Sequence, residues 1–400
     1  MVKPKKILVL TYWDFNDALI QTYTLPYLYI ITKYIPENST IYLLTLNKNT
    51  SYKINFYHPQ IKIIQFQYIP FGLKATFYYL YLLFYLFIFI LIKNITCIHA
   101  WCTPAGMFGY ILSIITQRPL IIDSYEPHAE AMVEVGEWKK NSLPFRLLFY
   151  FEKKMTHHAK YLIATTQRMI TEYAVNRYKY NPEKNNWYVK PACVNLDWFR
   201  PDYDKRLQFR KKLNLDNKIV GIYAGKFGGI YLEEEVFEWI KCAVQYWGDK
   251  FRFLILSSHS EEYIIHKCQK HNIETMYILL KFVPHKEVPY YLNVADFALT
   301  PVKPVYTKKF CSPIKNGEYW AMGLPVIITK DISDDSDIIQ QHKAGVVLEY
   351  LTKESYIKSI KEMDEILQRD KSETQQKIRN LAFHYRNFEN IEIIYQKIYN

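Results

Sequence analysis

Short apolar runs alternate with longer stretches of mixed character along the first half of the chain. Because strands buried on both faces of a parallel sheet are continuously apolar, each short run predicts one such strand, and the longer stretches predict helices. The predicted strands span residues 6–11, 40–46, 61–67, 97–101, 119–123 and 161–165, and the predicted helices span 18–34, 75–92, 106–116 and 143–159. This order is typical of a doubly wound α/β domain.

The same alternation returns after a loop at residues 181–204, which contains Pro182, Pro191 and Pro201. Further strands are predicted at 219–223, 251–257, 277–283, 297–301 and 345–348, and further helices at 233–247, 261–271 and 288–293. The fold class is therefore predicted as α/β, with two Rossmann-like doubly wound domains that face a central cleft. We place the N-terminal domain at 1–204, the C-terminal domain at 205–372, and at 373–400 a final amphipathic helix that packs back on the N-terminal domain.

One segment near the C-terminus combines helix signals with charged side chains. Ser312 suits an N-cap, and Gly323 suits the residue that ends the helix. Lys315 and Glu318 then share one helical face within its first two turns. A helix start attracts anions through its free N–H groups, and a carboxylate one turn further along can accept hydrogen bonds from two hydroxyls. A site that binds a phosphate beside a diol suits a nucleotide sugar.

The charge of the chain is uneven. The net charge is +12, and residues 1–205 carry 23 Lys and Arg against 14 Asp and Glu, so the surplus belongs to the first half. Basic surface suits anionic lipid head groups or phosphorylated substrates. No basic segment interleaved with aromatic residues stands out, so nucleic acid is not expected as a partner. The six cysteines are scattered without a metal-ligand pattern, which favours a reducing, cytoplasmic location.

Residues 75–92 form an uncharged and strongly aromatic stretch between Lys74 and Lys93. At about 1.5 Å per residue it would be roughly 27 Å long as a helix, just enough to cross a bilayer. The predicted strand at 97–101 follows at once, and spanning would leave that strand on the far side of the membrane. We therefore expect a helix packed on the sheet that, with the basic helix at 143–160, makes peripheral contact with the inner face of the membrane.

At this point the chain resembles retaining glycosyltransferases of family 4, which have the GT-B fold, over nearly its whole length. The most specific match is the segment from Ser312 to Ile328, with Lys315, Glu318, Gly323 and Pro325 in the family's pattern. Weaker matches follow in the family's order and spacing: Val194 to Pro201, Tyr223 to Lys226, and Val288 to Asp296.

The resemblance implies a donor site in the C-terminal domain. Glu318 would hold the donor ribose, and Lys226 and Lys315 would contact the diphosphate. Ser312 would also bind the donor, and Gly225, Gly228 and Gly229 would let the backbone approach it. Each position also has a plain structural alternative: a solvated helix residue, an exposed lysine or an ordinary turn. The family's first glutamate, eight residues before Glu318, is replaced here by Phe310.

The resemblance also places active-site groups after the predicted strand at 119–123. Asp123 and Glu126 match a family motif in which Tyr125 replaces the usual histidine, and His128 lies close enough to substitute for it. We expect Glu126 and His128 to position the sugar, with Asp123 and Tyr125 on the acceptor side; a purely structural role is the alternative. In such enzymes the donor phosphate itself accepts the acceptor's proton, so no strong protein nucleophile is required.

The loop after the first strand departs from the family. A diglycine is expected near residues 14–18, where this chain has Asp14 and Asp17. Because Asp17 would repel a diphosphate, we expect Asp14 and Asp17 to face the acceptor, or donor binding to be altered. His157 and His158 are adjacent on a helix and point apart, so they do not favour a metal site there. We expect no metal, because lysines can replace it at the diphosphate, and no other cofactor.

Together these observations favour a retaining glycosyltransferase that moves a sugar from a nucleotide-sugar donor to a glycan or lipid-linked acceptor, in cell-surface polysaccharide or glycolipid synthesis. Two alternatives stay open. One is a nucleotide-sugar epimerase of the same fold, which would not need a basic, aromatic acceptor domain. The other is a non-catalytic relative that binds the donor, which the altered loop and Phe310 motivate.

Overall fold

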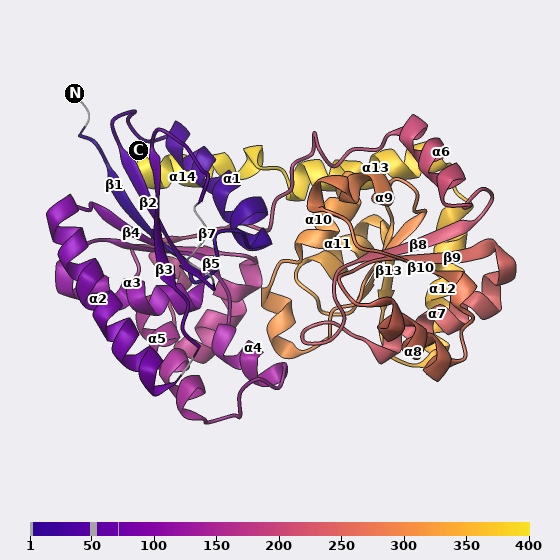
Figure 1. Cartoon of the computed structure of the whole chain (residues 1–400), viewed down its shortest axis with the longest axis horizontal. Coiled ribbons are helices and arrows are strands. Elements are labelled where there is room, and N and C mark those ends of the chain that lie inside the picture. Colours follow the sequence, from indigo (N-terminus) through magenta and orange to yellow (C-terminus); the bar gives the residue numbers. More distant parts are fainter. Residues whose placement is uncertain (1–2, 49–53, 71) are drawn as a thin grey trace. The chain divides into compact units, whose positions relative to one another are not determined.

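The computed structural model describes residues 3–48, 54–70 and 72–400. These residues form two compact units: unit 1, Met1–Pro191 with Ile391–Asn400, and unit 2, Ala192–Asn390 (Figure 1). Each unit is a parallel sheet with helices packed against it, so the α/β fold with two doubly wound units is confirmed.

The described part of unit 1 contains one parallel sheet, in the order β3-β2-β1-β4-β5-β6-β7. Its strands are β1 (Lys6–Leu10), β2 (Thr40–Asn47), β3 (Ile61–Gln67), β4 (Cys97–Trp101), β5 (Leu120–Tyr125), β6 (Tyr161–Ala164) and β7 (Trp187–Val189). Its helices are α1 (Leu25–Lys33), α2 (Leu73–Lys93), α3 (Thr103–Thr116), α4 (His128–Glu134), α5 (Leu143–His158) and α14 (Glu389–Tyr399), with π-helical turns at Leu19–Thr24 and Met169–Tyr178.

Unit 2 repeats this arrangement with the order β10-β9-β8-β11-β12-β13. Its strands are β8 (Ile219–Ala224), β9 (Phe251–Leu256), β10 (Ile278–Lys281), β11 (Phe297–Thr300), β12 (Val326–Thr329) and β13 (Gly345–Leu348). Its helices are α6 (Tyr203–Lys212), α7 (Glu234–Trp247), α8 (Glu261–His271), α9 (Val288–Leu292), α10 (Ile314–Ala321), α11 (Asp335–His342), α12 (Lys353–Leu367) and α13 (Lys371–Tyr385).

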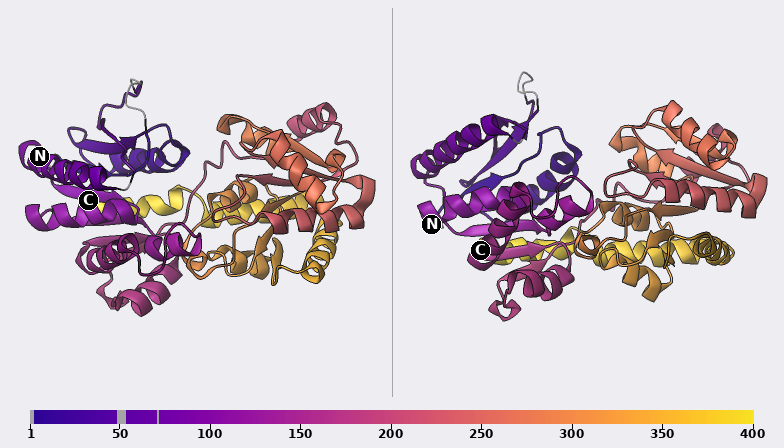
Figure 2. Two further views of the ribbon diagram at one scale, coloured as in Figure 1. Left: turned by 60° about the horizontal axis from the view of Figure 1, so that its bottom comes forward. Right: turned by 90° about the horizontal axis from the view of Figure 1, so that it is seen from below.

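Side chains of the unit 2 sheet alternate between two apolar cores, because successive residues of a strand point to opposite faces. Val220 and Ile222 of β8 belong to the core that includes α10 and α13, whereas Tyr223 belongs to the core of α7, α8 and α12. Helices accordingly lie on both faces of this sheet (Figure 2). At Gly221 a Cβ atom would lie 2.7 Å from the Phe297 ring and 2.8 Å from the Phe253 ring, so only glycine fits there.

The strand order reverses at one point in each sheet. In unit 1 the chain passes from one side of β1 to the other when it enters β4, and in unit 2 the same happens between β8 and β11. In doubly wound sheets, ligands bind outside the carboxyl ends of the strands at this switch point. The residues that follow β1, β4, β8 and β11 are therefore the first places to look for a site.

The boundary between the units lies earlier than the predicted boundary at 204/205. Val194, Leu196 and Phe199 are buried in a core of unit 2, and the N–H of Val194 donates to the carbonyl of Arg386. The predicted loop at 181–204 also contains strand β7 and the start of helix α6. The prolines at 182, 191 and 201 had pointed to a continuous linker, but tertiary packing assigns residues 192–204 to unit 2.

The single helix predicted at 373–400 is wrong. The structure has two helices there, and α13 packs on α10 of unit 2 through Ile378 and Leu381. Only residues from Ile391 onward belong to unit 1, where α14 lies beside α1 (Figure 1) and Lys33 contacts Glu392 at 2.5 Å. The expectation that the C-terminus returns to unit 1 therefore holds for the last ten residues only.

Helix α14 is tied to the sheet of unit 1 by two tyrosines. The Tyr395 hydroxyl donates to a carboxylate oxygen of Asp123 at 2.7 Å, and the Tyr399 hydroxyl lies 2.7 Å from Nδ1 of His99. All four side chains are buried, so these hydrogen bonds form away from water, where an unmade one is costly.

We expect Tyr395→Phe to lower the free energy of unfolding by about 1–3 kcal/mol, because the buried Asp123 carboxylate would lose a donor. Urea denaturation followed by circular dichroism measures the change. Tyr350→Phe is the control, because Tyr350 is 69% exposed and should change stability little. Equal stability of wild type and Tyr395→Phe would show that α14 is held by apolar packing alone.

Candidate donor and acceptor sites

The loop after β8 lies at the switch point of unit 2 and carries the predicted donor residues Gly225, Lys226, Gly228 and Gly229. Lys226 is exposed. Gly228 and Gly229 have φ of +80° and +61°, a conformation that favours glycine.

Two hydrogen bonds fix the shape of this loop. The N–H of Phe227 donates to Nε2 of His259 at 2.9 Å, and the Tyr223 hydroxyl donates to the carbonyl of Lys226 at 2.6 Å. A third contact, the bridge between Tyr231 and Val302, joins the chain beyond the loop to the segment after β11. The loop therefore places the exposed Lys226 beside Gly228 and Gly229, and these contacts hold the loop in one conformation.

Helix α10 begins at Ile314, with Pro313 rather than Ser312 at the N-cap position. The prediction that Ser312 caps this helix is therefore wrong. The Ser312 hydroxyl instead accepts hydrogen bonds from the N–H of Ala192, at 3.0 Å, and from the Arg386 guanidinium. These contacts of Ser312 are structural. They link Ala192 at the start of unit 2, and Arg386 at the end of α13, to the loop before α10.

A buried polar network holds α10 in place. Asn316 donates to a carboxylate oxygen of Asp335 at 2.6 Å, and the Thr300 hydroxyl donates to Asn316. Arg386 pairs with the other oxygen of Asp335. Burial raises the pKa of Asp335, and the nearby Arg386 guanidinium opposes that effect. The network joins β11, α10, α11 and the end of α13, so the rotation of α10 about its axis is fixed.

Lys315, Glu318 and His285 form a charged group on α10 and the loop after β10. Nζ of Lys315 lies 2.9 Å from one carboxylate oxygen of Glu318, and Nε2 of His285 lies 3.4 Å from the other. Burial opposes ionisation of Glu318, but Lys315 and His285 outweigh it and hold its pKa below the ordinary value. The Glu318 side chain is 2% exposed, whereas those of Lys315 and His285 are 26% and 30% exposed. Glu318 is thus an ionised acceptor at the base of a partly open group.

Tyr231 lies among the same charges. Burial raises the pKa of Tyr231, and Lys315 and Lys308 oppose the shift. Phe310, at the position of the family's first glutamate, is completely buried and packs edge-on against Tyr306 with ring centroids 5.1 Å apart. This position therefore serves the core of unit 2, and Glu318 lacks a second carboxylate there.

Asp123 lies in the interior of unit 1 and not on an acceptor-side surface. One carboxylate oxygen is 2.8 Å from Nζ of Lys190 and accepts from the N–H of Ser124. The other accepts from Tyr395 and lies 3.3 Å from Nε2 of His99. Burial favours the neutral acid, but Lys190 and His99 lower the pKa of Asp123 to about 2. Asp123 is a buried structural anion, because its oxygens are engaged by the protein itself.

Tyr125 is also internal, which corrects its expected place on the acceptor side. Its side chain is completely buried, and its hydroxyl is hydrogen-bonded to Thr156 of α5. In a strand, successive side chains point to opposite faces, and β5 directs Tyr125 toward the helix layer. The tyrosine anchors α5 to the sheet.

Glu126 and His128 come directly after β5, at the carboxyl edge of the unit 1 sheet, and both are half-buried. The His128 ring packs edge-on against Tyr12, which follows β1, with centroids 6.3 Å apart. Burial raises the pKa of Tyr12, and the nearby Cys102 and Glu126 add to the rise. Groups after β1, β4 and β5 thus meet at the switch point of unit 1, and the sugar-positioning role of Glu126 and His128 stays a prediction.

Asp14 and Asp17 hold the loop after β1. The Asp14 carboxylate accepts from the N–H groups of Asn16, at 3.0 Å, and Lys48, at 2.9 Å. The Asp17 carboxylate accepts from the N–H of Leu19 at 2.8 Å and is exposed. Both carboxylates form local turns of the kind that aspartate favours, so their acceptor role stays a prediction.

Two functional candidates were missed by sequence reasoning. His285 carries no motif of its own, but it lies beside Glu318 with its ring 4.9 Å from that of Trp198. Glu152 is completely buried on α5, and its carboxylate accepts from the N–H of Ala129 in the first turn of α4 and from the Tyr178 hydroxyl, each at 2.9 Å. Burial raises the pKa of Glu152 to about 7. Glu152 therefore holds the start of α4, whose first residue is His128.

Within residues 3–48, 54–70 and 72–400, no group of three or more His, Cys, Asp or Glu side chains is placed to hold a metal ion. His157 and His158 point to different partners, the carbonyl of Tyr178 and the hydroxyl of Ser113. That neither a metal nor another cofactor takes part stays a prediction.

We expect Asp123→Asn to destabilise the protein by about 3–5 kcal/mol at neutral pH, because Lys190 would be left buried without its counter-ion. The folded-state pKa of Asp123, about 2, lies below its unfolded value of about 3.9. The ionised carboxylate therefore stabilises the fold above pH 4, and this contribution is lost as the pH falls through about 2.

Denaturant titrations of wild type and Asp123→Asn between pH 7 and pH 2.5 measure this effect. The difference in the free energy of unfolding between the two proteins should become smaller as the pH falls. Asp17→Asn is the control, since Asp17 is exposed. A stability difference that does not change with pH would contradict the conclusion that Asp123 is buried and ionised.

Comparisons with known proteins bear on the family and the fold of this chain. The sequence model of the family described as Glycosyl transferases group 1 matches residues 223–365, a stretch of unit 2 that contains Lys226, Lys315 and Glu318. A search of curated protein sequences finds no match to the chain.

Several solved structures share the fold over nearly the whole chain. Sucrose-phosphate synthase from Thermosynechococcus elongatus superposes with a TM-score of 0.71 at 15% sequence identity, over 99% of this chain and 98% of that one. Anabaena HepE in complex with UDP has a TM-score of 0.71 at 12% identity, over 98% of both chains. A putative UDP-N-acetylglucosamine 2-epimerase from Listeria monocytogenes has a TM-score of 0.63 at 13% identity, over 98% of this chain and 94% of that one.

At such low identity these structures establish the fold, which transferases and a putative epimerase share. The family match covers the charged group on α10, since Lys315, Glu318 and His285 lie within residues 223–365. Residues 223–365 of this chain therefore match the model of the glycosyl transferases group 1 family, within a chain that has the two-unit GT-B fold.

Proposed function

We propose that the protein is a retaining glycosyltransferase that takes its sugar from a nucleotide-sugar donor bound to unit 2. The observation that carries the proposal is the group formed by Lys315, Glu318 and His285, inside the segment matched to the family and near the switch point of the sheet. An ionised, largely buried carboxylate that accepts hydrogen bonds can hold the ribose hydroxyls of a nucleotide.

In this proposal the cations near Glu318 neutralise the leaving diphosphate. Lys226 is exposed after β8, and Lys315 is one turn before Glu318 on α10. The left-handed Gly228 and Gly229 supply backbone N–H groups that side chains do not shield. Positioning and charge neutralisation then lower the barrier without a metal or another cofactor. Glu126 and His128 of unit 1 are proposed to position the sugar.

The donor nucleotide is proposed to be a uridine diphosphate, because one of the similar structures was determined in complex with UDP. The sugar and the new linkage are left open by this proposal. A nucleotide-sugar epimerase is the second candidate, because a putative enzyme of that kind shares the fold. A non-catalytic donor-binding relative is the third, because Asp14 and Asp17 occupy the loop in which the family has glycines.

The surface of unit 1 favours a transferase with a lipid-linked acceptor over both alternatives. Helix α2 is the only helix in the described residues that is long and apolar enough to cross a membrane. Only 22% of its most apolar 18-residue stretch is buried in the protein. Its buried side, with Leu82, Leu86 and Ile90, faces the protein. Its other side exposes large apolar side chains: Phe77, Leu80, Tyr81, Phe84, Ile88, Leu91 and Ile92.

Helix α5 extends this surface, since α2 packs on α3 and α3 packs on α5. Leu143 and Tyr150 are exposed on α5, as are the basic residues Arg146, Lys153 and Lys154. Apolar side chains flanked by cations suit the interface of an anionic membrane. We propose that this surface rests on the cytoplasmic face of the membrane, where lipid-linked acceptors of cell-surface polysaccharide or glycolipid synthesis are presented.

We expect Glu318→Gln to weaken UDP binding about 10- to 100-fold, because a charged hydrogen-bond acceptor for the ribose would be lost. Thermal stabilisation and calorimetric titration with UDP and GDP measure the effect. Glu362→Gln on α12 is the matched control, since Glu362 is remote in sequence and its side chain is 43% exposed.

Transfer from a panel of nucleotide sugars then separates the candidates. Release of nucleotide with a new glycosidic bond supports the transferase, and epimerised sugar without an acceptor supports the epimerase. Binding of UDP without any turnover supports the non-catalytic relative. Full transferase activity in Glu318→Gln would contradict the assigned donor site.

We expect the double variant Phe77→Ser, Phe84→Ser to lose most of its flotation with anionic vesicles, because these rings are 68% and 65% exposed on α2. Flotation is compared between phosphatidylglycerol and phosphatidylcholine vesicles. Phe282→Ser is the control, because Phe282 is 78% exposed but lies in unit 2. Unchanged flotation of the double variant would rule out α2 as the contact.

A further inference from the structure

A cavity of about 660 Å³ lies at the amino edge of the unit 2 sheet, opposite the edge that carries the candidate donor site. It is bordered by the starts of β8 and β11, the turn from Met322 to Pro325, the end of α12 and the starts of α6 and α13. Its volume falls within the range of about 300–1,000 Å³ that is usual for small-molecule sites. None of the candidate donor or acceptor residues lines this amino-edge cavity.

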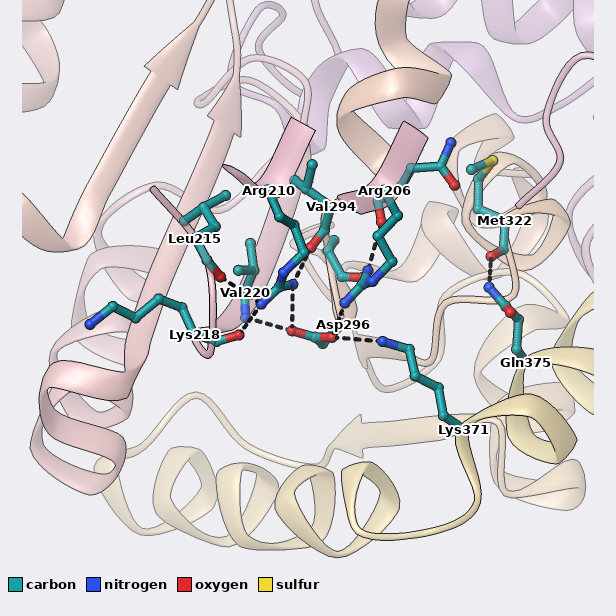
Figure 3. A network of polar contacts seen from close by, with 12 residues as sticks. Arg206, Arg210, Leu215, Lys218, Val220, Val294, Asp296, Met322, Lys371 and Gln375 are labelled. Carbon is teal, nitrogen blue, oxygen red and sulfur yellow. Dashed lines mark hydrogen bonds and ion pairs between the residues drawn. The ribbon is translucent and has the colours of Figure 1, made fainter. Parts of the chain in front are cut away.

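Three cations gather around the carboxylate of Asp296, a largely buried residue that lines this cavity (Figure 3). Asp296 contacts Arg206 at 2.6 Å, Arg210 at 3.3 Å and Lys371 at 3.3 Å. Arg369 also lines the cavity, whereas the Lys218 ammonium points away from Asp296 (Figure 3) and donates to the carbonyl of Asp249 at 2.8 Å. The other acidic residue in the lining is Asp202, which contacts Lys205 at 3.6 Å. Because three cations contact Asp296, its single carboxylate leaves a surplus of positive charge there.

The two arginines are held rigidly. Arg206 donates to the carbonyls of Asn293 and Ala295, each at 2.6 Å, and Arg210 donates to the carbonyl of Val294 at 2.6 Å (Figure 3). These bonds fix the guanidinium groups before any ligand arrives, which reduces the entropy lost on binding.

Lys371 is the cation with room to move. Its side chain is 62% exposed, and it reaches Asp296 from the first turn of α13 (Figure 3). Burial, together with Arg206 and Arg210, lowers the pKa of Lys371, although Asp296 opposes the shift. A bound anion would relieve this repulsion.

The remaining walls are largely apolar. They include Leu292, Met322, Leu324, Pro325 and Ile366, and the ring of Tyr203 at the rim is 72% exposed. A site lined by both cations and apolar side chains suits a small organic anion better than an inorganic ion. The surplus of more than one positive charge suits a doubly charged group, such as a phosphate monoester.

We propose that the amino-edge cavity binds a small organic phosphate, with the phosphate near Lys371 and Arg206 and the organic group against the apolar wall. This ligand is distinct from the nucleotide sugar, because the candidate donor residues lie at the opposite edge of the sheet. The cavity wall includes the end of α10, since Nε2 of Gln375 donates to the carbonyl of Met322 at 3.3 Å (Figure 3). Occupation of the cavity therefore stabilises the turn that follows α10.

The test uses phenyl phosphate as the probe and isothermal titration calorimetry as the measurement. It is made in a Lys226→Gln, Lys315→Gln background, which removes the cations of the candidate donor site. We expect Lys371→Gln in this background to bind phenyl phosphate roughly tenfold more weakly, for the loss of one charge-assisted hydrogen bond. Lys377→Gln is the matched control, because Lys377 lies on the same helix and its side chain is 72% exposed.

Hydrogen exchange locates the probe. Phenyl phosphate should slow exchange in residues 201–206 and 366–375 and leave residues 225–231 unchanged. Inorganic phosphate should bind more weakly than phenyl phosphate, because it cannot contact the apolar wall. The proposal is overturned if Lys371→Gln binds phenyl phosphate as tightly as its background, if protection appears only at residues 225–231, or if the two probes bind equally.

Discussion

A buried ion pair between an aspartate and a cation is the interaction on which each unit depends. In unit 1, Asp123 and Lys190 are both completely buried and join β5 to the segment after β7, and Tyr395 adds α14 to the same carboxylate. In unit 2, Asp335 and Arg386 join α11 to the end of α13, and Asn316 adds α10. A charge in the interior is tolerated only when its partners are in place, so these pairs determine which segments must pack together.

The consequence is that the carboxyl edges of the two sheets carry groups with fixed orientations. In unit 2 the Asp335 network sets the rotation of α10, and Lys315 and Glu318 project from that helix toward His285. In unit 1 the fixed end of β5 is followed by Glu126 and His128, and Glu152 holds the first turn of α4. The amino edge of the unit 2 sheet is organised by a third carboxylate, Asp296, whose side chain is 16% exposed and which contacts three cations. One sheet thus offers two chemically different ligand environments at its opposite edges.

Sequence reasoning located most of the strands and helices, because a strand buried on both faces must be continuously apolar, as in β1, β8 and β11. It missed β7, which lies in the predicted loop at 181–204. It also located Lys315 and Glu318, since their spacing on a helix fixes their relation without tertiary information. It failed for Asp123 and Tyr125, whose polar atoms are engaged inside the fold, and for the N-cap role of Ser312. It missed His285, which acquires a role only where the loop after β10 approaches α10, and Glu152, which is 23 residues from the Ala129 N–H that it binds.

By itself the sequence determined the two doubly wound units, the motif on α10 and the apolar, aromatic character of α2, because each follows from local periodicity and spacing. Only the tertiary structure decided the boundary at residues 191/192, the division of the C-terminal stretch between α13 and α14, and the reassignment of Asp123 from a binding group to a buried anion. The physical reason is the same in each case. The solvation of a charge and the packing of a segment depend on partners far away in the chain, and sequence spacing does not specify them.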